Sequence, residues 1–66
     1  MKRYLLEKSL NESGLQIRDI ADELGVSAFT LNLKLRGKAE FTVDEATLLC
    51  KILELSKEEA VEIFFG

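Results

Sequence analysis

The segment SAFTLNLKLRGK, Ser27–Lys38, is compatible with two secondary structures, and the choice between them decides the fold. Its apolar residues alternate with polar ones, and they are Phe29, Leu31, Leu33 and Leu35. This alternation is typical of a half-buried strand, which would pair with residues 41–43 across a turn at 36–38. Most residues of the segment are nevertheless good helix formers, and only Thr30 is β-branched. We therefore favour a helix and keep the hairpin as the alternative.

The segments that precede this stretch have the spacing of short amphipathic helices. In Lys2–Ser13 the leucines fall on one stripe, and in Gln16–Leu24 the apolar residues recur at i, i+3, i+4 and i+7. Gly14 and Gly25 follow these segments, where a helix end favours a residue that tolerates positive φ. Ser27 then offers an N-cap for a third helix.

Two capping boxes mark the starts of two further helices. Thr42 with Glu45, and Ser56 with Glu59, each place a hydroxyl and a carboxylate three residues apart, so that each side chain can bond a free backbone amide. Apolar residues follow both boxes and include Cys50, which we interpret as a small core residue. The sequence therefore predicts one all-α domain of five short helices over residues 1–66.

The composition argues against several classes of protein. A chain of 66 residues builds a marginal core, to which association with a second copy would add burial. It has no histidine and one cysteine, which excludes an ordinary zinc site and a Ser–His or Cys–His catalytic pair. No phosphate-binding glycine loop is present. We expect no enzymatic activity, no cofactor, no metal, no membrane segment and a cytoplasmic location.

Charge is unevenly distributed along the chain, whose net charge is −3. Residues 1–26 carry −1, residues 27–39 carry +3 and residues 40–66 carry −5. The positive segment owes its charge to Lys34, Arg36 and Lys38 and has no acidic residue. Such polarity can set a basic edge against phosphates and keep the acidic remainder away from them. An ordinary solvated surface is the alternative explanation of these cations.

A group of small and apolar residues spans the two central segments, and consists of Ile20, Ala21, Leu24, Gly25, Val26 and Leu31. The pattern GK-EFT-DE follows it, from Gly37 to Glu45. With these residues the run from Gly14 to Phe65 resembles the phage repressor/Cro type of helix-turn-helix DNA-binding domain, in the small version common in prophages. The resemblance implies motif helices at about 16–24 and 27–36, joined by a tight turn.

The resemblance also implies that the helix Ser27–Arg36 lies in the major groove of double-stranded DNA. The implied base-reading positions are Ala28, Phe29, Asn32 and Leu33. The implied phosphate contacts are Gln16, Ser27, Thr30, Lys34, Arg36 and Lys38. For Lys34, a solvated surface position is an equal alternative. The chain departs from the family where Gln16 and Ile17 replace the usual Thr-Gln pair, which weakens the cap and removes a phosphate contact unless Gln16 supplies it.

A second departure concerns the apolar residues of this helix. On a helical wheel Leu31 and Leu35 form a stripe that faces the core, whereas Phe29 and Leu33 form another on the side expected to face DNA. The second stripe has three interpretations. It contacts thymine methyl groups while Asn32 bonds adenine, it is a protein-interaction surface, or it is core in a rotated helix or a strand.

The last segment, Val61–Phe65, has more apolar surface than a short terminal helix needs. We expect Val61, Phe64 and Phe65 to form a homodimer interface; alternatively Phe64 caps the core and Phe65 frays. The sequence thus predicts a sequence-specific DNA-binding transcription regulator, a prophage-type repressor. The alternative is a protein-interaction adaptor that uses Ala28, Phe29 and Leu33 on the same fold.

Overall fold

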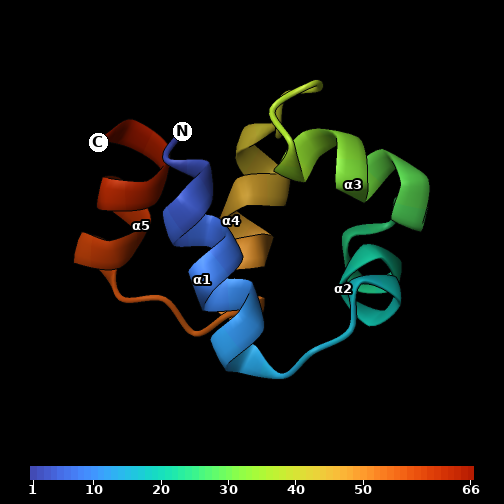
Figure 1. Ribbon diagram of the computed structural model, residues 1–66, viewed down its shortest axis with the longest axis horizontal. Helices are drawn as coiled ribbons and strands as arrows, with labels where there is room; N and C mark the ends of the chain where they lie inside the picture. Colours follow the sequence, from blue (N-terminus) through green and yellow to red (C-terminus); the bar gives the residue numbers. More distant parts are fainter.

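The chain folds into five helices and no strand, and the computed structural model describes all of residues 1–66. The helices are α1 (Arg3–Ser13), α2 (Ile17–Leu24), α3 (Ala28–Leu35), α4 (Val43–Ile52) and α5 (Lys57–Phe65), as Figure 1 shows. The all-helical prediction is confirmed. The hairpin alternative is wrong, because residues 28–35 are helical and residues 41–42 lead directly into α4.

Side-chain caps start three of the five helices. The Oγ of Ser27 accepts a hydrogen bond from the N–H of Thr30 at 3.0 Å, and both predicted capping boxes are formed. By contrast, α2 begins after Gln16 without a side-chain cap bond, as its sequence indicated. The predicted motif helices exceed the observed ones at their ends because they included the capping residues.

Helices α2, α3 and α4 end in the same type of hydrogen-bonded turn. In α3 the N–H of Lys38 bonds to the carbonyl of Leu33 at 2.9 Å, and the following turn passes through a left-handed residue. Gly25 and Gly37 occupy that position in α2 and α3, with φ of 76° and 77°. Helix α4 places Glu54 there at φ 54°, the one non-glycine residue with positive φ.

The core is entirely apolar and draws on every helix. Its buried residues are Leu6, Leu10, Ile20, Ala21, Leu31, Leu35, Leu49 and Ile63. Leu31 and Leu35 point inward from α3, which confirms the predicted core stripe. Cys50 is half-buried and is not among the buried core residues, so its interpretation as a core residue is wrong.

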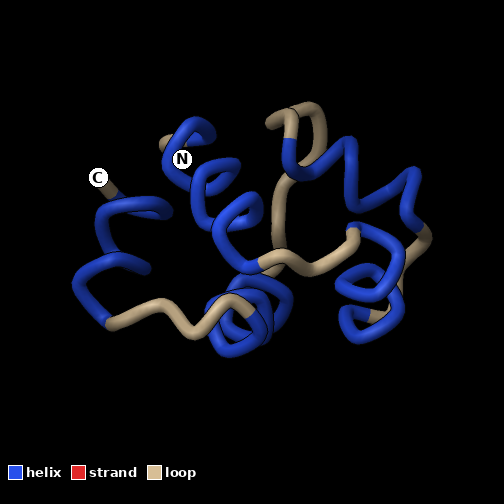
Figure 2. Tube along the Cα trace, turned by 60° about the horizontal axis from the view of Figure 1, so that its bottom comes forward, coloured by secondary structure: helices blue, strands red, loops and turns tan.

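Helix α1 lies between α5 and the α2–α3 pair in Figures 1 and 2. Helix α2 packs against α3 and α4, and α1 packs against α3 and α5. The two ends of the chain lie close together in both views, and the N–H of Lys2 bonds to the carbonyl of Ile63 at 2.7 Å. None of the helices has the length and apolarity needed to cross a membrane.

Candidate nucleic-acid interface

The α2–α3 pair is held by a short turn and a small residue in α2. Ala21 is 1% exposed, and only Gly25, Val26 and Ser27 separate the two helices. Val26 donates its N–H to the carbonyl of Ala21 at 3.0 Å, so the turn is closed by backbone bonds. This geometry sets one side of α3 against the core and leaves the other side free.

The free side of α3 carries the four residues that the resemblance implied as base-reading: Ala28, Phe29, Asn32 and Leu33. Ala28 and Asn32 are exposed, Phe29 is 73% exposed and Leu33 is half-buried. The interpretation of Phe29 as a core residue is therefore wrong. The remaining two interpretations both require an accessible apolar surface, and we call these four residues the free face of α3.

The hydroxyl groups at the start of α3 bond mainly to each other. Ser27 Oγ donates to Thr30 Oγ1 at 3.0 Å and also caps the helix, so both side chains are ordered at its first turn. Gln16 precedes α2, is exposed, and accepts a bond from Arg18 through its Oε1 at 3.1 Å. The amide nitrogen of Gln16 has no bond within the protein and is available to an external acceptor.

Lys34 is placed differently from what the sequence suggested. Its Nζ pairs with Glu45 in α4, and the two side chains are 12% and 16% exposed. The interpretation as a solvated surface lysine is wrong, because a carboxylate from another helix covers the ammonium. The bond from Lys34 holds the pKa of Glu45 below its usual value, with the Thr42 backbone N–H as the next cause.

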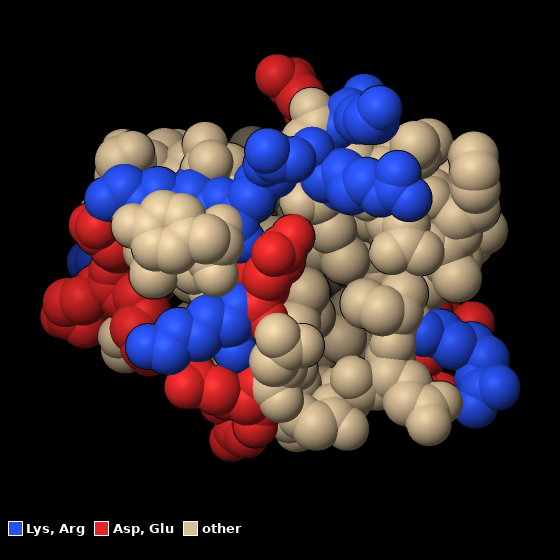
Figure 3. Space-filling view, in the orientation of Figure 1, with Lys and Arg blue, Asp and Glu red and all other residues tan.

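A basic edge formed by Arg36 and Lys38 follows α3. Both residues are exposed and neither forms an ion pair. Arg3 joins them from the start of α1, since its Nη1 donates to the carbonyl of Arg36 at 2.5 Å. Figure 3 shows Lys and Arg atoms gathered along the upper edge of this view, over the start of α1 and the loop after α3. The Arg3 contact was not predicted from the sequence, because it depends on how α1 packs.

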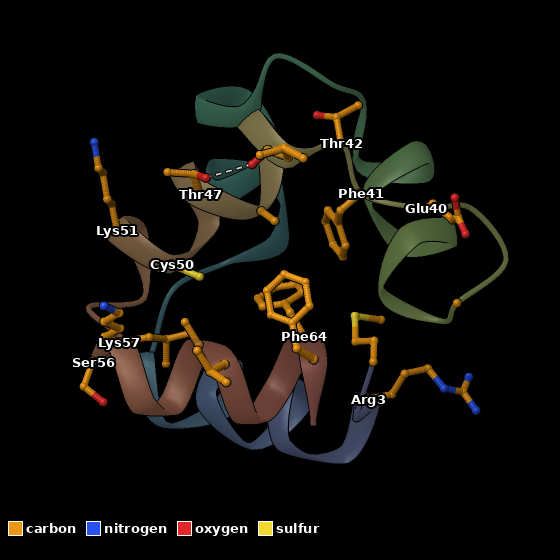
Figure 4. A pocket seen from close by; sticks show the side chains of 18 of the residues that line it. Arg3, Glu40, Phe41, Thr42, Thr47, Cys50, Lys51, Ser56, Lys57 and Phe64 are labelled. Atoms are coloured by element: carbon orange, nitrogen blue, oxygen red, sulfur yellow. Dashed lines mark hydrogen bonds between the residues drawn. The ribbon is translucent and has the colours of Figure 1, made fainter.

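An open groove of about 970 Å³ lies between α4, α5 and the loop that precedes α4. Figure 4 shows Phe41 and Phe64 side by side within it, and their rings meet edge to face at 6.0 Å and 86°. Cys50 also lines it, and burial raises the pKa of its thiol. Of the predicted dimer residues, Phe64 is half-buried in this groove, whereas Val61 and Phe65 are 49% and 85% exposed beside it.

The molecule thus presents an exposed helix side beside a basic edge, and an apolar groove on α4 and α5. No group of three or more Cys, Asp or Glu side chains is arranged to hold a metal ion. Comparison with protein-family models, with curated proteins and with solved structures finds no match.

Proposed function

We propose that this protein is a non-enzymatic DNA-binding regulator of the phage repressor/Cro helix-turn-helix type, with α3 as the helix that enters the major groove. The observation that carries the proposal is the free face of α3, next to cations that have no ion-pair partner. An α-helix with its side chains is about 10–12 Å in diameter, which suits a major groove about 12 Å wide.

The chemistry of the free face favours A·T base pairs. Ala28, Phe29 and Leu33 offer methyl, ring and isobutyl groups, which contact the thymine methyl but cannot bond a base edge. Asn32 is exposed and is the one residue of the four able to make paired hydrogen bonds, for which adenine is the usual partner. We therefore expect a preference for A·T steps with modest discrimination among them.

Phosphate contacts in this proposal come from both ends of the α2–α3 pair. Arg36 and Lys38 supply the charge at the end of α3, whereas Gln16 before α2, and Ser27 and Thr30 at the start of α3, supply neutral hydrogen bonds. Lys34 has an internal partner in Glu45, so its contribution is to hold α3 against α4. Each cationic contact adds affinity that falls with salt.

A second copy of the chain would supply a second reading helix, as two-fold symmetric operators require. The groove region offers an apolar contact for it, because Val61 and Phe65 are exposed beside Phe64. Helix α5 also carries Glu58, Glu59 and Glu62, which repel phosphates and suit a surface turned away from DNA.

A protein-interaction adaptor is the second candidate. The exposure of Phe29, at 73%, favours it, because a large aromatic side chain on a free surface marks many interaction sites. The net charge of −3 also weakens attraction to DNA at long range. An adaptor would function without the basic edge and without binding duplex DNA.

Duplex binding across a salt series tests the proposal, with fluorescence anisotropy as the readout and A·T-rich and mixed duplexes as the probes. Arg36 and Lys38 alone predict that log affinity falls with log salt at a slope of about 1.8 per protomer. Lys38→Ala should weaken all duplexes alike, whereas Lys8→Ala, an exposed cation of α1, should change little. Absence of binding to any duplex at low salt contradicts the proposal and favours the adaptor.

A further inference from the structure

Arg3 is joined to the end of α3 although 33 positions separate it from Arg36 in the chain. Its Nη1 donates to the Arg36 carbonyl at 2.5 Å, one of the carbonyl groups left free at the end of the helix. A Cβ on Gly37 would lie 3.4 Å from the Cδ of Arg3, so the arginine side chain runs directly over this turn. The start of α1 is therefore part of the surface that follows α3.

Three cations meet at this place: Arg3, Arg36 and Lys38. None of them forms an ion pair, and Glu40, the acidic residue of the same loop, pairs with none of them. Figure 3 shows Lys and Arg atoms gathered along the upper edge of this view, where α1 begins and the loop after α3 lies. Clustered positive charge without internal partners raises the local potential and attracts anions.

Lys2, the neighbour of Arg3 in sequence, shows the contrast. Its Nζ pairs with Glu62 of α5, and the hydrogen bond to that carboxylate raises the pKa of Lys2. One of two adjacent cations is thus matched by an acidic group of the protein. The other, Arg3, is held against a neutral carbonyl and keeps its positive charge unmatched.

We propose that Arg3 contacts a DNA phosphate and, with Arg36 and Lys38, forms a three-cation site for one stretch of sugar-phosphate backbone at the end of α3. This inference rests on the proposed DNA-binding function and extends its footprint to α1. The bond to Arg36 uses only Nη1, which leaves Nη2 and Nε of the guanidinium for phosphate oxygens. The planar fork of arginine matches two such oxygens at once.

Two substitutions separate this role from a purely structural one. Arg3→Gln keeps a polar side chain and removes the charge, whereas Arg3→Lys keeps the charge and removes the fork. Lys8→Gln is the matched control, because it removes one exposed cation of the same helix that lies beside residues of α5. Thermal unfolding followed by circular dichroism establishes that each variant folds.

The readout is the slope of log affinity against log salt on one duplex. We expect Arg3→Gln to lower the slope by about 0.9 per protomer. For each bound protomer, the loss of affinity between 50 and 200 mM salt should then be about 3.5-fold smaller than in the parent protein. Arg3→Lys and Lys8→Gln should keep the parental slope. An unchanged slope in Arg3→Gln, or an equal loss in Lys8→Gln, overturns the role of Arg3 while the proposed function stands. A parent protein that binds no duplex overturns both.

Discussion

One carboxylate oxygen of Glu45 accepts hydrogen bonds from Lys34 Nζ and from the backbone N–H of Thr42. The same atom therefore completes the capping box of α4 and connects α4 to α3. Both side chains of the Lys34–Glu45 pair are largely covered, at 12% and 16% exposed. The position of α3 relative to the core thus depends on an ion pair as well as on Leu31 and Leu35.

A double-mutant cycle on this pair should show strong coupling. Lys34→Met keeps the apolar stem without the charge, and Glu45→Gln keeps a residue suited to the capping box. Because the pair is partly buried, we expect each single change to cost about 1–2 kcal/mol, between the values for exposed and buried pairs. The double variant should lose about 1 kcal/mol less than the sum, measured by urea unfolding. Additive losses would show that the pair contributes no coupling.

The stability of the protein should fall in acid partly through Glu45. Its pKa is lower in the folded protein than its ordinary value of 4.5. Its contribution is therefore complete above that ordinary value and is lost as the pH falls through the folded pKa. Glu45→Gln should flatten the decline in Tm between about pH 5 and pH 3. Glu59→Gln, which removes a capping carboxylate without a lysine partner, is the control and should flatten it less.

Truncation of Phe29 and of Leu31 should change the stability of the protein by very different amounts. Phe29 is 73% exposed, so Phe29→Ala should change the free energy of unfolding by no more than about 0.5 kcal/mol. Leu31 is fully buried, so Leu31→Ala should cost about 2–5 kcal/mol. If Phe29 contacts bases, its truncation also reduces the preference for A·T-rich over mixed duplexes. Unfolding of Phe29→Ala would show that its ring belongs to the core.

The end of α4 offers a stabilising substitution. Glu54 adopts φ 54°, the position that glycine fills in the matching turns of α2 and α3. Glu54→Gly should raise stability by about 0.5–1 kcal/mol, because glycine avoids the steric cost of the left-handed region. Gly37→Ala is the reverse change at φ 77° and should lower stability by about 1 kcal/mol. Thermal unfolding of both variants tests these two predictions. A Glu54→Gly variant less stable than the parent protein would show that the left-handed conformation of Glu54 carries no steric cost.

Association of the chain should depend on Phe65. Its side chain is 85% exposed at the end of α5, so Phe65→Glu should leave the folded monomer intact. If the groove region is the dimer contact, the same change weakens dimerisation by at least tenfold, measured by sedimentation equilibrium. Tyr4→Glu, at an aromatic residue 67% exposed on α1, is the matched control and should have no effect. Equal behaviour of the two variants would place the contact elsewhere.

Local signals in the sequence predicted most of the fold. Glycines at helix ends, the Ser27 cap and the two capping boxes all act within a few residues, so their effects can be read without knowledge of packing. The wheel of α3 also assigned Leu31 and Leu35 to the core. It did not show that Leu33 is half-buried.

The contacts between side chains of different helices could not be predicted from the sequence. Lys34 pairs with Glu45 across 11 positions and Arg3 bonds Arg36 across 33, and each contact exists only because two helices pack at one angle. No periodicity encodes these partners. The left-handed turn at Glu54 was not predicted for a different reason. Glycine at a helix end indicates such a turn, whereas glutamate does not.

The backbone bond between Lys2 and Ile63 has a consequence for engineering. Since the ends of the chain are already neighbours, a short flexible linker can join them into a closed ring without disturbing the helices. Such a cyclic chain loses less conformational entropy on folding, which matters most where the core is small. New ends can then be opened in an exposed connection such as Gly14–Leu15.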